Sequence, residues 1–282
     1  MNLGKNVLTK LLMVSIFLAF PTVVMAQAGN TTSTNTMQRP FLGLGQGMGL
    51  GRNAATCPFG AAGNLASFVA RMPAQSLSKQ EKQGLIKMAE EEKLARDVYK
   101  ALYNKWRMPV FNMIAQAEQR HMETMQALLK KYNLKDPIAN LKPGEFQSSQ
   151  MKSLYNQLVT TGAKSVVDAL KVGDTIEDLD IHDLQMELKH TDNQDIKVAY
   201  QNLLKGSRNH MRAFSHMLLR AGEKYTPKYI SQNEFNSIIN SPIEKGLYNA
   251  NGNPIFRRLM RRPRRPLGRR GRGAGAGMGR RM

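Results

Sequence analysis

Apolar residues recur at alternating steps of three and four positions in four long stretches of the chain, which fall between residues 78 and 222. This spacing places apolar side chains along one face of an α-helix, and no stretch convincingly shows the period of two typical of a β-strand. We therefore expect an all-α protein, an antiparallel four-helix bundle over residues 78–230. The pattern predicts long helices over about 78–105, 109–132, 165–189 and 193–220 and a shorter one over about 149–161.

Residues that begin and end helices support these boundaries. Ser78 and Glu81 have the spacing of a capping box, in which the side chains accept hydrogen bonds from free backbone N–H groups. Pro109 suits the first turn of the second helix. Asp192 is expected to cap the last helix, and Gly222 is expected to end it.

Each of the four long apolar stripes becomes polar near its middle. A buried carboxylate costs on the order of several kcal/mol unless a partner compensates its charge. The midpoints of antiparallel helices lie at similar depth, so the four polar positions can meet around one shared metal site. These polar positions are Glu92, Glu118, His121, Glu177, Ser207 and His210.

The spacing of these residues matches a known arrangement of metal ligands in bundles. Di-iron and di-manganese carboxylate bundles take one Glu from each of two helices and a Glu-x-x-His pair from each of the other two. Glu92 and Glu177 fill the single-Glu roles, and Glu118 with His121 forms a complete pair.

The second Glu-x-x-His pair is incomplete. His210 is its histidine, but Ser207 stands where the glutamate should be, and a serine hydroxyl is a poor ligand. Asp180, one turn from a predicted ligand, or Glu91 could supply the missing carboxylate. The sequence therefore leaves open whether the site holds one ion or two.

The same side chains also have ordinary explanations. A single glutamate on an apolar stripe often reaches solvent at the edge of the core, and a lone histidine is more often hydrogen-bonded than a ligand. Arg96, Arg120 and Arg208 could also neutralise some of the acids as ion pairs. The agreement of all four stripes favours a shared metal site over these separate explanations.

Short motifs at these positions resemble known families. The segment from Glu92 to Tyr99 resembles the first-helix motif of rubrerythrins, Glu-x-x-Ala-Arg-x-x-Tyr, whose glutamate is a metal ligand. Segments 90–99, 118–122, 176–181 and 206–214 more closely resemble the ferritin-like family called domain of unknown function 2202. The resemblance covers about residues 78–230 and implies a ferritin-like fold and site; that family has no settled biochemical role. It places Glu92, Glu118, His121, Glu177 and His210 at ligand positions, and Ser207 departs from the pattern.

The first residues have the pattern of a signal peptide, predicted over 1–26. Lys5 and Lys10 precede the apolar run Leu11–Met25, and Ala26 completes a small-residue cleavage site. The alternative is a membrane anchor, but the run is shorter than the ~20 apolar residues that a spanning helix needs. We expect an exported protein, periplasmic or extracellular, with no membrane-spanning segment after cleavage.

Composition outside the bundle predicts less regular segments. Residues 27–77 are rich in Gln, Asn, Thr, Gly and Met and are expected to form a low-complexity linker. Cys57 is the one cysteine, so no internal disulfide can form. A short segment over 231–250 should pack on the bundle, and a disordered Arg- and Gly-rich tail is predicted over 251–282.

The tail carries much of the net charge of +20, because it holds eleven arginines and no acidic residue. Such a tail attracts polyanions without reading sequence, and nothing in the bundle resembles a reader of nucleic-acid sequence. The accessible polyanions of an exported protein are anionic lipid, acidic polysaccharide and extracellular DNA.

Two functions from different classes remain. The first is an exported ferritin-like metal-binding protein that holds iron or, less favoured, manganese, zinc or copper, with redox chemistry toward oxygen or peroxide if it is an enzyme. The second is a metal-free helical interaction module that associates with anionic envelope components through its basic tail. The long extensions suit a small homo-oligomer better than a closed cage.

Overall fold

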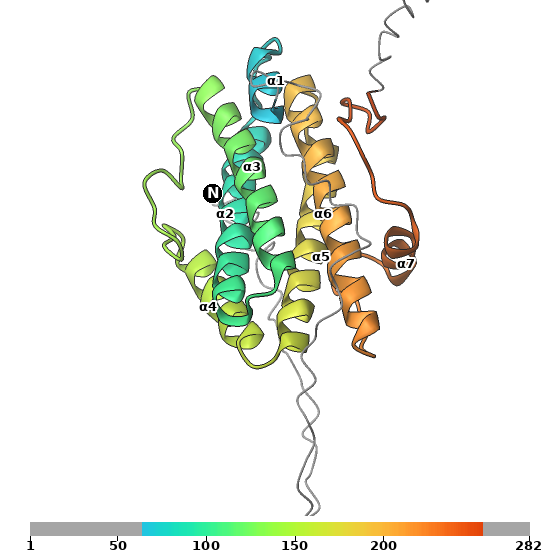
Figure 1. The fold of residues 1–282 in the computed structure, drawn as a ribbon. Coiled ribbons are helices and arrows are strands. Elements are labelled where there is room, and N and C mark those ends of the chain that lie inside the picture. The colour runs from blue at the N-terminus through green and yellow to red at the C-terminus, as the bar shows by residue number, and fades with distance from the viewer. Residues whose placement is uncertain (1–63, 256–282) are drawn as a thin grey trace, which may run out of the picture. The chain divides into compact units, whose positions relative to one another are not determined.

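The computed structural model describes residues 64–255, which form seven helices. The only β pairing within these residues is an isolated bridge between Tyr248 and Pro254, so the predicted all-α class is confirmed. No helix in this part of the chain is long and apolar enough to cross a bilayer. The helices are α1 (Leu65–Arg71), α2 (Lys79–Trp106), α3 (Pro109–Lys131), α4 (Ser149–Gly162), α5 (Val166–His190), α6 (Gln194–Arg220) and α7 (Gln232–Asn240) (Figure 1).

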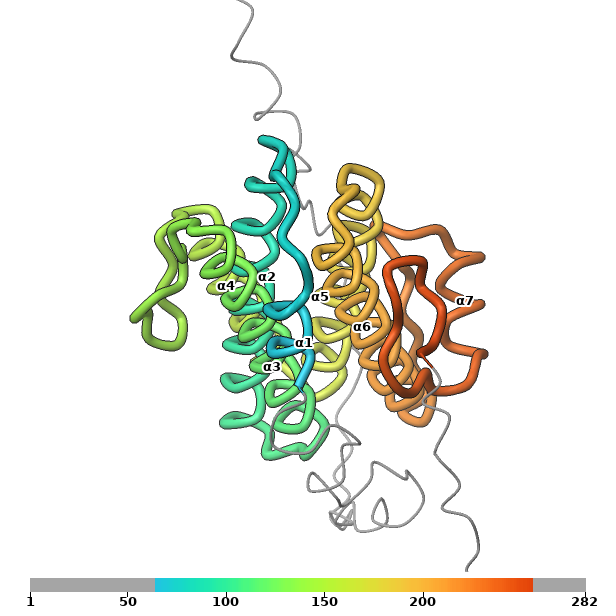
Figure 2. The backbone as a smooth tube through the Cα atoms, turned by 90° about the horizontal axis from the view of Figure 1, so that it is seen from above, coloured from blue at the N-terminus to red at the C-terminus, as the bar shows by residue number. Residues whose placement is uncertain are grey.

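Helices α2, α3, α5 and α6 form the bundle (Figures 1 and 2). Short turns join α2 to α3 and α5 to α6, so each of these pairs is antiparallel. The connection from α3 to α5 runs back to the other end of the bundle, and α4 within it packs against α2 and α5. One long crossover of this kind is the topology of ferritin-like bundles.

The core of the bundle is apolar at both ends. At one end, the ring of Phe214 packs on Tyr99 and Phe111, with centroids 5.4 and 5.7 Å apart. At the other end, Leu85 and Met125 are completely buried. Burial of each such side chain stabilises the fold by about 1.5–3 kcal/mol, so these two layers hold the bundle together around its polar middle.

The predicted capping box at the start of α2 is present. Ser78 Oγ accepts a hydrogen bond from Glu81 N at 3.1 Å, and Glu81 Oε2 accepts one from Ser78 N at 2.8 Å. Glu81 Oε1 also accepts a bond from Thr191 Oγ1 at 2.6 Å. The same carboxylate therefore ties the start of α2 to the turn between α5 and α6.

The start of α6 differs from the prediction. Asn193, not Asp192, is the N-cap, and its side chain makes no capping bond. Instead, Gln194 N donates to Gln75 Oε1 at 2.7 Å, so a distant side chain satisfies a free N–H at this helix start. Gly222, which follows α6, has a φ of 78°, a left-handed conformation that favours glycine at a helix end.

The structure also has a helix that the sequence did not predict. Residues 65–71 fall in the predicted linker, but they form α1, which packs against α3 and α6. Asn64 caps this helix, and Lys131 Nζ donates to Val69 O at 3.0 Å while it pairs with Asp195 at 2.5 Å. Seven residues are too few for a clear apolar period, so contacts with the bundle define this helix. The predicted signal peptide and nearly all of the basic tail lie outside the described residues.

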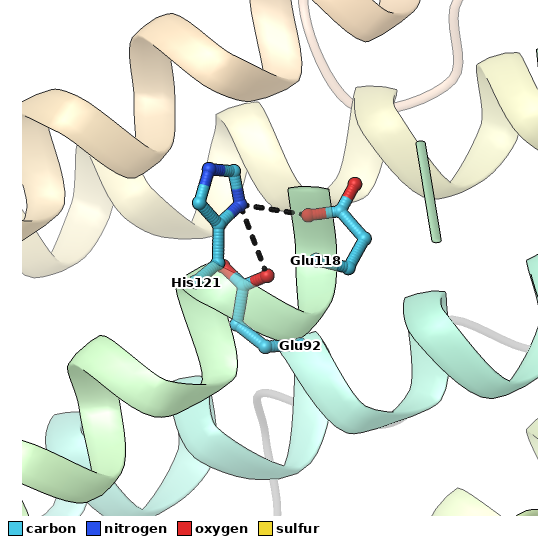
Figure 3. Close-up of side chains that lie close together, drawn as sticks. All are labelled: Glu92, Glu118 and His121. Atoms are coloured by element: carbon cyan, nitrogen blue, oxygen red, sulfur yellow. Dashed lines mark ion pairs between the residues drawn. The ribbon is translucent and has the colours of Figure 1, made fainter. Parts of the chain in front are cut away.

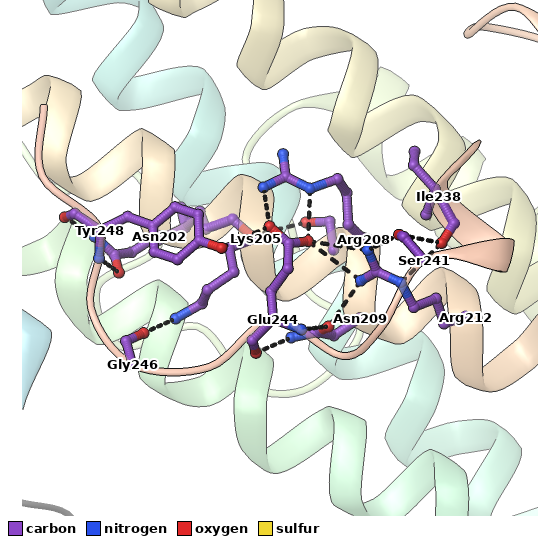
Figure 4. Close-up of polar contacts among 12 residues, drawn as sticks. Asn202, Lys205, Arg208, Asn209, Arg212, Ile238, Ser241, Glu244, Gly246 and Tyr248 are labelled. Atoms are coloured by element: carbon purple, nitrogen blue, oxygen red, sulfur yellow. Dashed lines mark hydrogen bonds and ion pairs between the residues drawn. The ribbon is translucent and has the colours of Figure 1, made fainter. Parts of the chain in front are cut away.

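Residues 221–255 form a strap along α6 (Figures 1 and 4). Glu244 in this strap accepts hydrogen bonds from Arg208 of α6 at 2.6 and 2.8 Å. Asn202 of α6 exchanges two hydrogen bonds with the backbone of Tyr248, at 2.8 and 2.9 Å. These contacts fix the strap to the helix that carries one of the two predicted histidine ligands.

Candidate metal centre

The structure brings all five predicted ligand side chains together in the middle of the bundle. They come from four helices, so the cluster exists only when the bundle is assembled. The three glutamates are almost completely buried, with 1–2% of their surface exposed. The residues are Glu92 of α2, Glu118 and His121 of α3, Glu177 of α5 and His210 of α6.

The first triad consists of Glu92, Glu118 and His121 (Figure 3). His121 Nδ1 lies 2.7 Å from Glu118 Oε2 and 3.4 Å from Glu92 Oε2. One ligand atom from each of the three residues lies within 4.8 Å of the other two. A single ion could therefore contact all three side chains.

The second triad consists of Glu118, Glu177 and His210 and has the same form. His210 Nδ1 lies 2.7 Å from Glu118 Oε1 and 3.5 Å from Glu177 Oε2. Glu118 thus turns one oxygen toward each histidine, and the two imidazole centroids are 5.8 Å apart. A carboxylate shared in this way is suited to bridge two ions.

Several buried polar atoms in the triads have no hydrogen-bond partner. His121 Nδ1 and His210 Nδ1 each lie close to a carboxylate oxygen, but the contacts are not aligned as hydrogen bonds. Glu92 Oε1 and Glu118 Oε1 are also buried without a partner. Burying such atoms unsatisfied is costly, so the arrangement fits a cation that would take up their lone pairs.

The charges of the cluster also favour a bound cation. Burial raises the pKa of Glu92 well above its usual value, and the nearby Glu118 and Glu177 raise it further. Burial also acts to raise the pKa of Glu118, but His210 and His121 outweigh it and hold the pKa below its usual value. Three carboxylates in one buried layer repel one another, and a divalent cation would relieve this repulsion.

The arginines that could have neutralised these acids lie elsewhere or bind other partners. Arg96 pairs with Asp97 at 2.7 Å, and Arg208 pairs with Glu244 at 2.6 Å. Arg120 is exposed. Among the described ion pairs, those of the three central glutamates involve only the two histidines.

Neighbouring residues position the ligands. Tyr99 donates a hydrogen bond to Glu177 Oε1 at 2.5 Å, which orients this carboxylate so that its other oxygen faces His210. Gly206 leaves space for the other imidazole, because a Cβ at this position would lie 2.4 Å from His121 Cε1. Gly206 was not among the predicted site residues, although a glycine in the interior of a helix often marks a close packing contact.

The incomplete pair has an unexpected neighbour. The hydroxyl of Ser207 donates a hydrogen bond to Asp180 Oδ2, so a carboxylate from α5 occupies the space beside this serine. Glu91 Oε1 lies 3.7 Å from Lys87 Nζ, and Glu91 Oε2 is buried without a hydrogen-bond partner. Asp180 is the acid that is hydrogen-bonded to Ser207 of the incomplete pair.

The donor set consists of imidazole nitrogen and carboxylate oxygen. Such a set suits iron, manganese and zinc, whereas sites that select soft ions are rich in thiolate or thioether ligands. The one cysteine, Cys57, lies outside the described residues. The residues present thus fit a divalent ion of borderline hardness.

Comparisons with known proteins support the fold. The family described as "Uncharacterized protein domain (DUF2202)" matches residues 81–242. The uncharacterized protein MJ0754 of Methanocaldococcus jannaschii is 54% identical over 180 residues, which are 64% of this chain and 97% of that protein. The crystal structure of hypothetical protein MJ0754 from Methanococcus jannaschii DSM 2661 matches with a TM-score of 0.60 and 56% identity, over 61% of this chain and 99% of that chain. These relatives bring no assigned activity, so the chemistry must be argued from the site.

Proposed function

We propose that this chain, which belongs to the family of the uncharacterized protein domain DUF2202, is a metal-binding protein that holds ions in the two triads. The position of Glu118 carries the proposal. Its two oxygens each lie 2.7 Å from the Nδ1 atom of a different histidine, so one buried carboxylate lies between the two triads. A buried carboxylate with this surrounding has the form of a ligand shared between two ions.

Iron is the favoured ion, with manganese, zinc and copper as alternatives. Two carboxylates and one imidazole for each ion match the ligand types of di-iron and di-manganese bundles. Bound iron would supply redox chemistry toward oxygen or peroxide. The protein's own contribution is to bury the ligands between two apolar layers and to hold Glu177 through Tyr99.

Location and the tail form a separate part of the proposal. The apolar run and cleavage pattern of residues 1–26 support export to the periplasm or the exterior. The eleven arginines of residues 257–281 support attraction to anionic lipid or polysaccharide at the envelope. Fractionation of cells and N-terminal sequencing of the mature chain would test the first point, and salt-dependent binding to anionic vesicles would test the second.

The metal content of the full chain tests the central proposal. The chain is loaded with ferrous iron without oxygen, freed of excess ion by gel filtration, and measured by elemental analysis. Glu118→Gln keeps the size of the side chain but removes the shared ligand, so it should abolish stoichiometric iron. Glu123→Gln is the matched control, because Glu123 lies on the same helix and accepts a bond from Gln119 outside both triads. Equal iron in both variants, or none in the unchanged chain, would leave the metal-free interaction module as the better account.

A further inference from the structure

We infer that Asp180 is a further metal ligand, which supplies from α5 the carboxylate that Ser207 does not supply from α6. The inference rests on the proposed function and makes it more specific, because it assigns two ions to the site. It also assigns a role to Ser207, which positions the Asp180 carboxylate through a hydrogen bond.

The antiparallel packing of α5 and α6 brings the two residues together. Asp180 lies three positions after Glu177, and Ser207 lies three positions before His210. Because Glu177 and His210 face each other in the second triad, the next turn of each helix places Asp180 beside Ser207. The hydrogen bond from Ser207 Oγ to Asp180 Oδ2 follows from this register.

Asp180 is a buried acid that contacts α6 through Ser207, one helical turn from the second triad. Burial raises its pKa well above the usual value, and the charges that raise it further belong to Glu92, Glu177 and then Glu118. These three residues supply every carboxylate of the two triads. The Ser207 contact and the spacing from Glu177 therefore put Asp180 next to the second triad, and its charge adds to that of the three glutamates.

The charge balance of the site favours this assignment. Glu92, Glu118 and Glu177 carry three negative charges, whereas two divalent ions carry four positive charges. Adding Asp180 gives four carboxylates and makes the loaded site neutral. Neutrality is important in a buried layer, because an uncompensated buried charge is strongly destabilising.

The same two helices offer a matched control. Asp174 of α5 is buried and accepts a hydrogen bond from Ser215 of α6 at 2.8 Å, so it is a second Asp–Ser pair of the same kind. The acids that raise the pKa of Asp174, after burial, are Glu177 and Asp178. Asp174→Asn therefore makes the same chemical change outside the two triads.

The test is ferrous iron binding to the full chain, measured by equilibrium dialysis without oxygen followed by elemental analysis. The unchanged chain and Asp174→Asn should bind two ions per chain. Asp180→Asn should bind one ion, or bind the second at least about 10-fold more weakly, as expected when a residue that supports the metal is lost. Two ions bound with unchanged affinity in Asp180→Asn would overturn the inference, and so would one ion in the unchanged chain.

A double variant separates a ligand role from a structural one. Asp180→Ser with Ser207→Glu returns the carboxylate to α6 and should restore the second ion, even if Asp180→Asn changes the melting temperature. A double variant that melts as the unchanged chain does but binds one ion would contradict the ligand role. The absence of iron from the unchanged chain would instead refute the proposed function, so the two failures are distinguishable.

Discussion

Replacing Gly206 with alanine should displace His121 and weaken the first triad without unfolding the bundle. A Cβ at position 206 would lie 2.4 Å from His121 Cε1 and 2.7 Å from His121 Nε2. Carbon atoms pack best at about 3.5–4.0 Å, so the new Cβ would lie about 1 Å too close to the imidazole. The Cβ is fixed to the helix backbone, and the imidazole must therefore move by about 1 Å.

This displacement is large compared with what a metal site tolerates. Distances from ligand to metal hold within about 0.2 Å, so a shift of about 1 Å removes the imidazole from the first coordination sphere or strains it strongly. The affinity of the first triad should fall by at least the roughly 10–100-fold that follows loss of a supporting residue. Alanine is favoured over glycine within a helix by about 1 kcal/mol, which opposes the cost of the overlap in the free energy of unfolding.

Calorimetric titration of the metal-free chain with ferrous iron, without oxygen, measures this effect, and a urea melt measures stability. Gly162→Ala is the control, because its Cβ would lie 2.6 Å from Leu102 Cδ2, an apolar side chain outside both triads. Gly206→Ala should lose affinity while Gly162→Ala retains it. Unchanged iron affinity in Gly206→Ala, with the fold intact, would refute the reasoning that His121 binds metal in this position.

Three other changes have separate expected results. Tyr99→Phe removes the hydrogen-bond donor to Glu177 and should weaken iron binding about 10-fold in the same titration, with little change in melting temperature. An unchanged iron affinity would argue against a positioning role for Tyr99. Asp97→Ala leaves the buried Lys93 without its ion pair and should lower the free energy of unfolding by about 3–5 kcal/mol in urea, whereas a loss below about 1 kcal/mol would contradict it. Burial raises the pKa of Asp174, so the stability from its bound proton is present below the ordinary value of 3.8 and is lost as pH rises through the raised pKa. Asp174→Asn should therefore have a larger free energy of unfolding than the unchanged chain at neutral pH. In urea melts this difference should shrink toward pH 4 by at most about 1.4 kcal/mol per pH unit, and a difference that stays constant with pH would contradict the prediction.

The helices of the bundle could be predicted from sequence because each is long and amphipathic. The helix expected over about 149–161 spans Ser149–Gly162, and the capping box at Ser78 lies where its spacing placed it. The apolar period reports burial directly, so a polar residue on that stripe is visible without a structure. This is why Glu92 and Glu177 could be chosen although they lie on different helices far apart in sequence.

Other features depend on contacts between elements and had no local signal. Helix α1 is too short to show a period and depends on contacts with α3 and α6. The N-cap role expected of Asp192 falls to Asn193, because Gln75 from a distant segment satisfies the free N–H of Gln194. Local capping rules cannot anticipate a partner so far away in the chain.

The fourth carboxylate of the site shows the same limit. The position of Asp180, one turn from Glu177, makes it a candidate ligand, but sequence position alone does not favour it over Glu91. The choice depends on the register of α5 against α6, which places Asp180 beside Ser207. Register between antiparallel helices arises from packing of the whole bundle and is not encoded in either helix alone.

The most direct test of the shared site is X-ray diffraction from crystals of the iron-loaded full chain, recorded at the iron absorption edge. The anomalous map should contain two peaks, one on each side of Glu118, the first beside His121 and the second beside His210. Peaks at these positions would establish the shared carboxylate as the centre of the site. A map without a peak near Glu118, from crystals soaked in ferrous iron at saturating concentration, would contradict it.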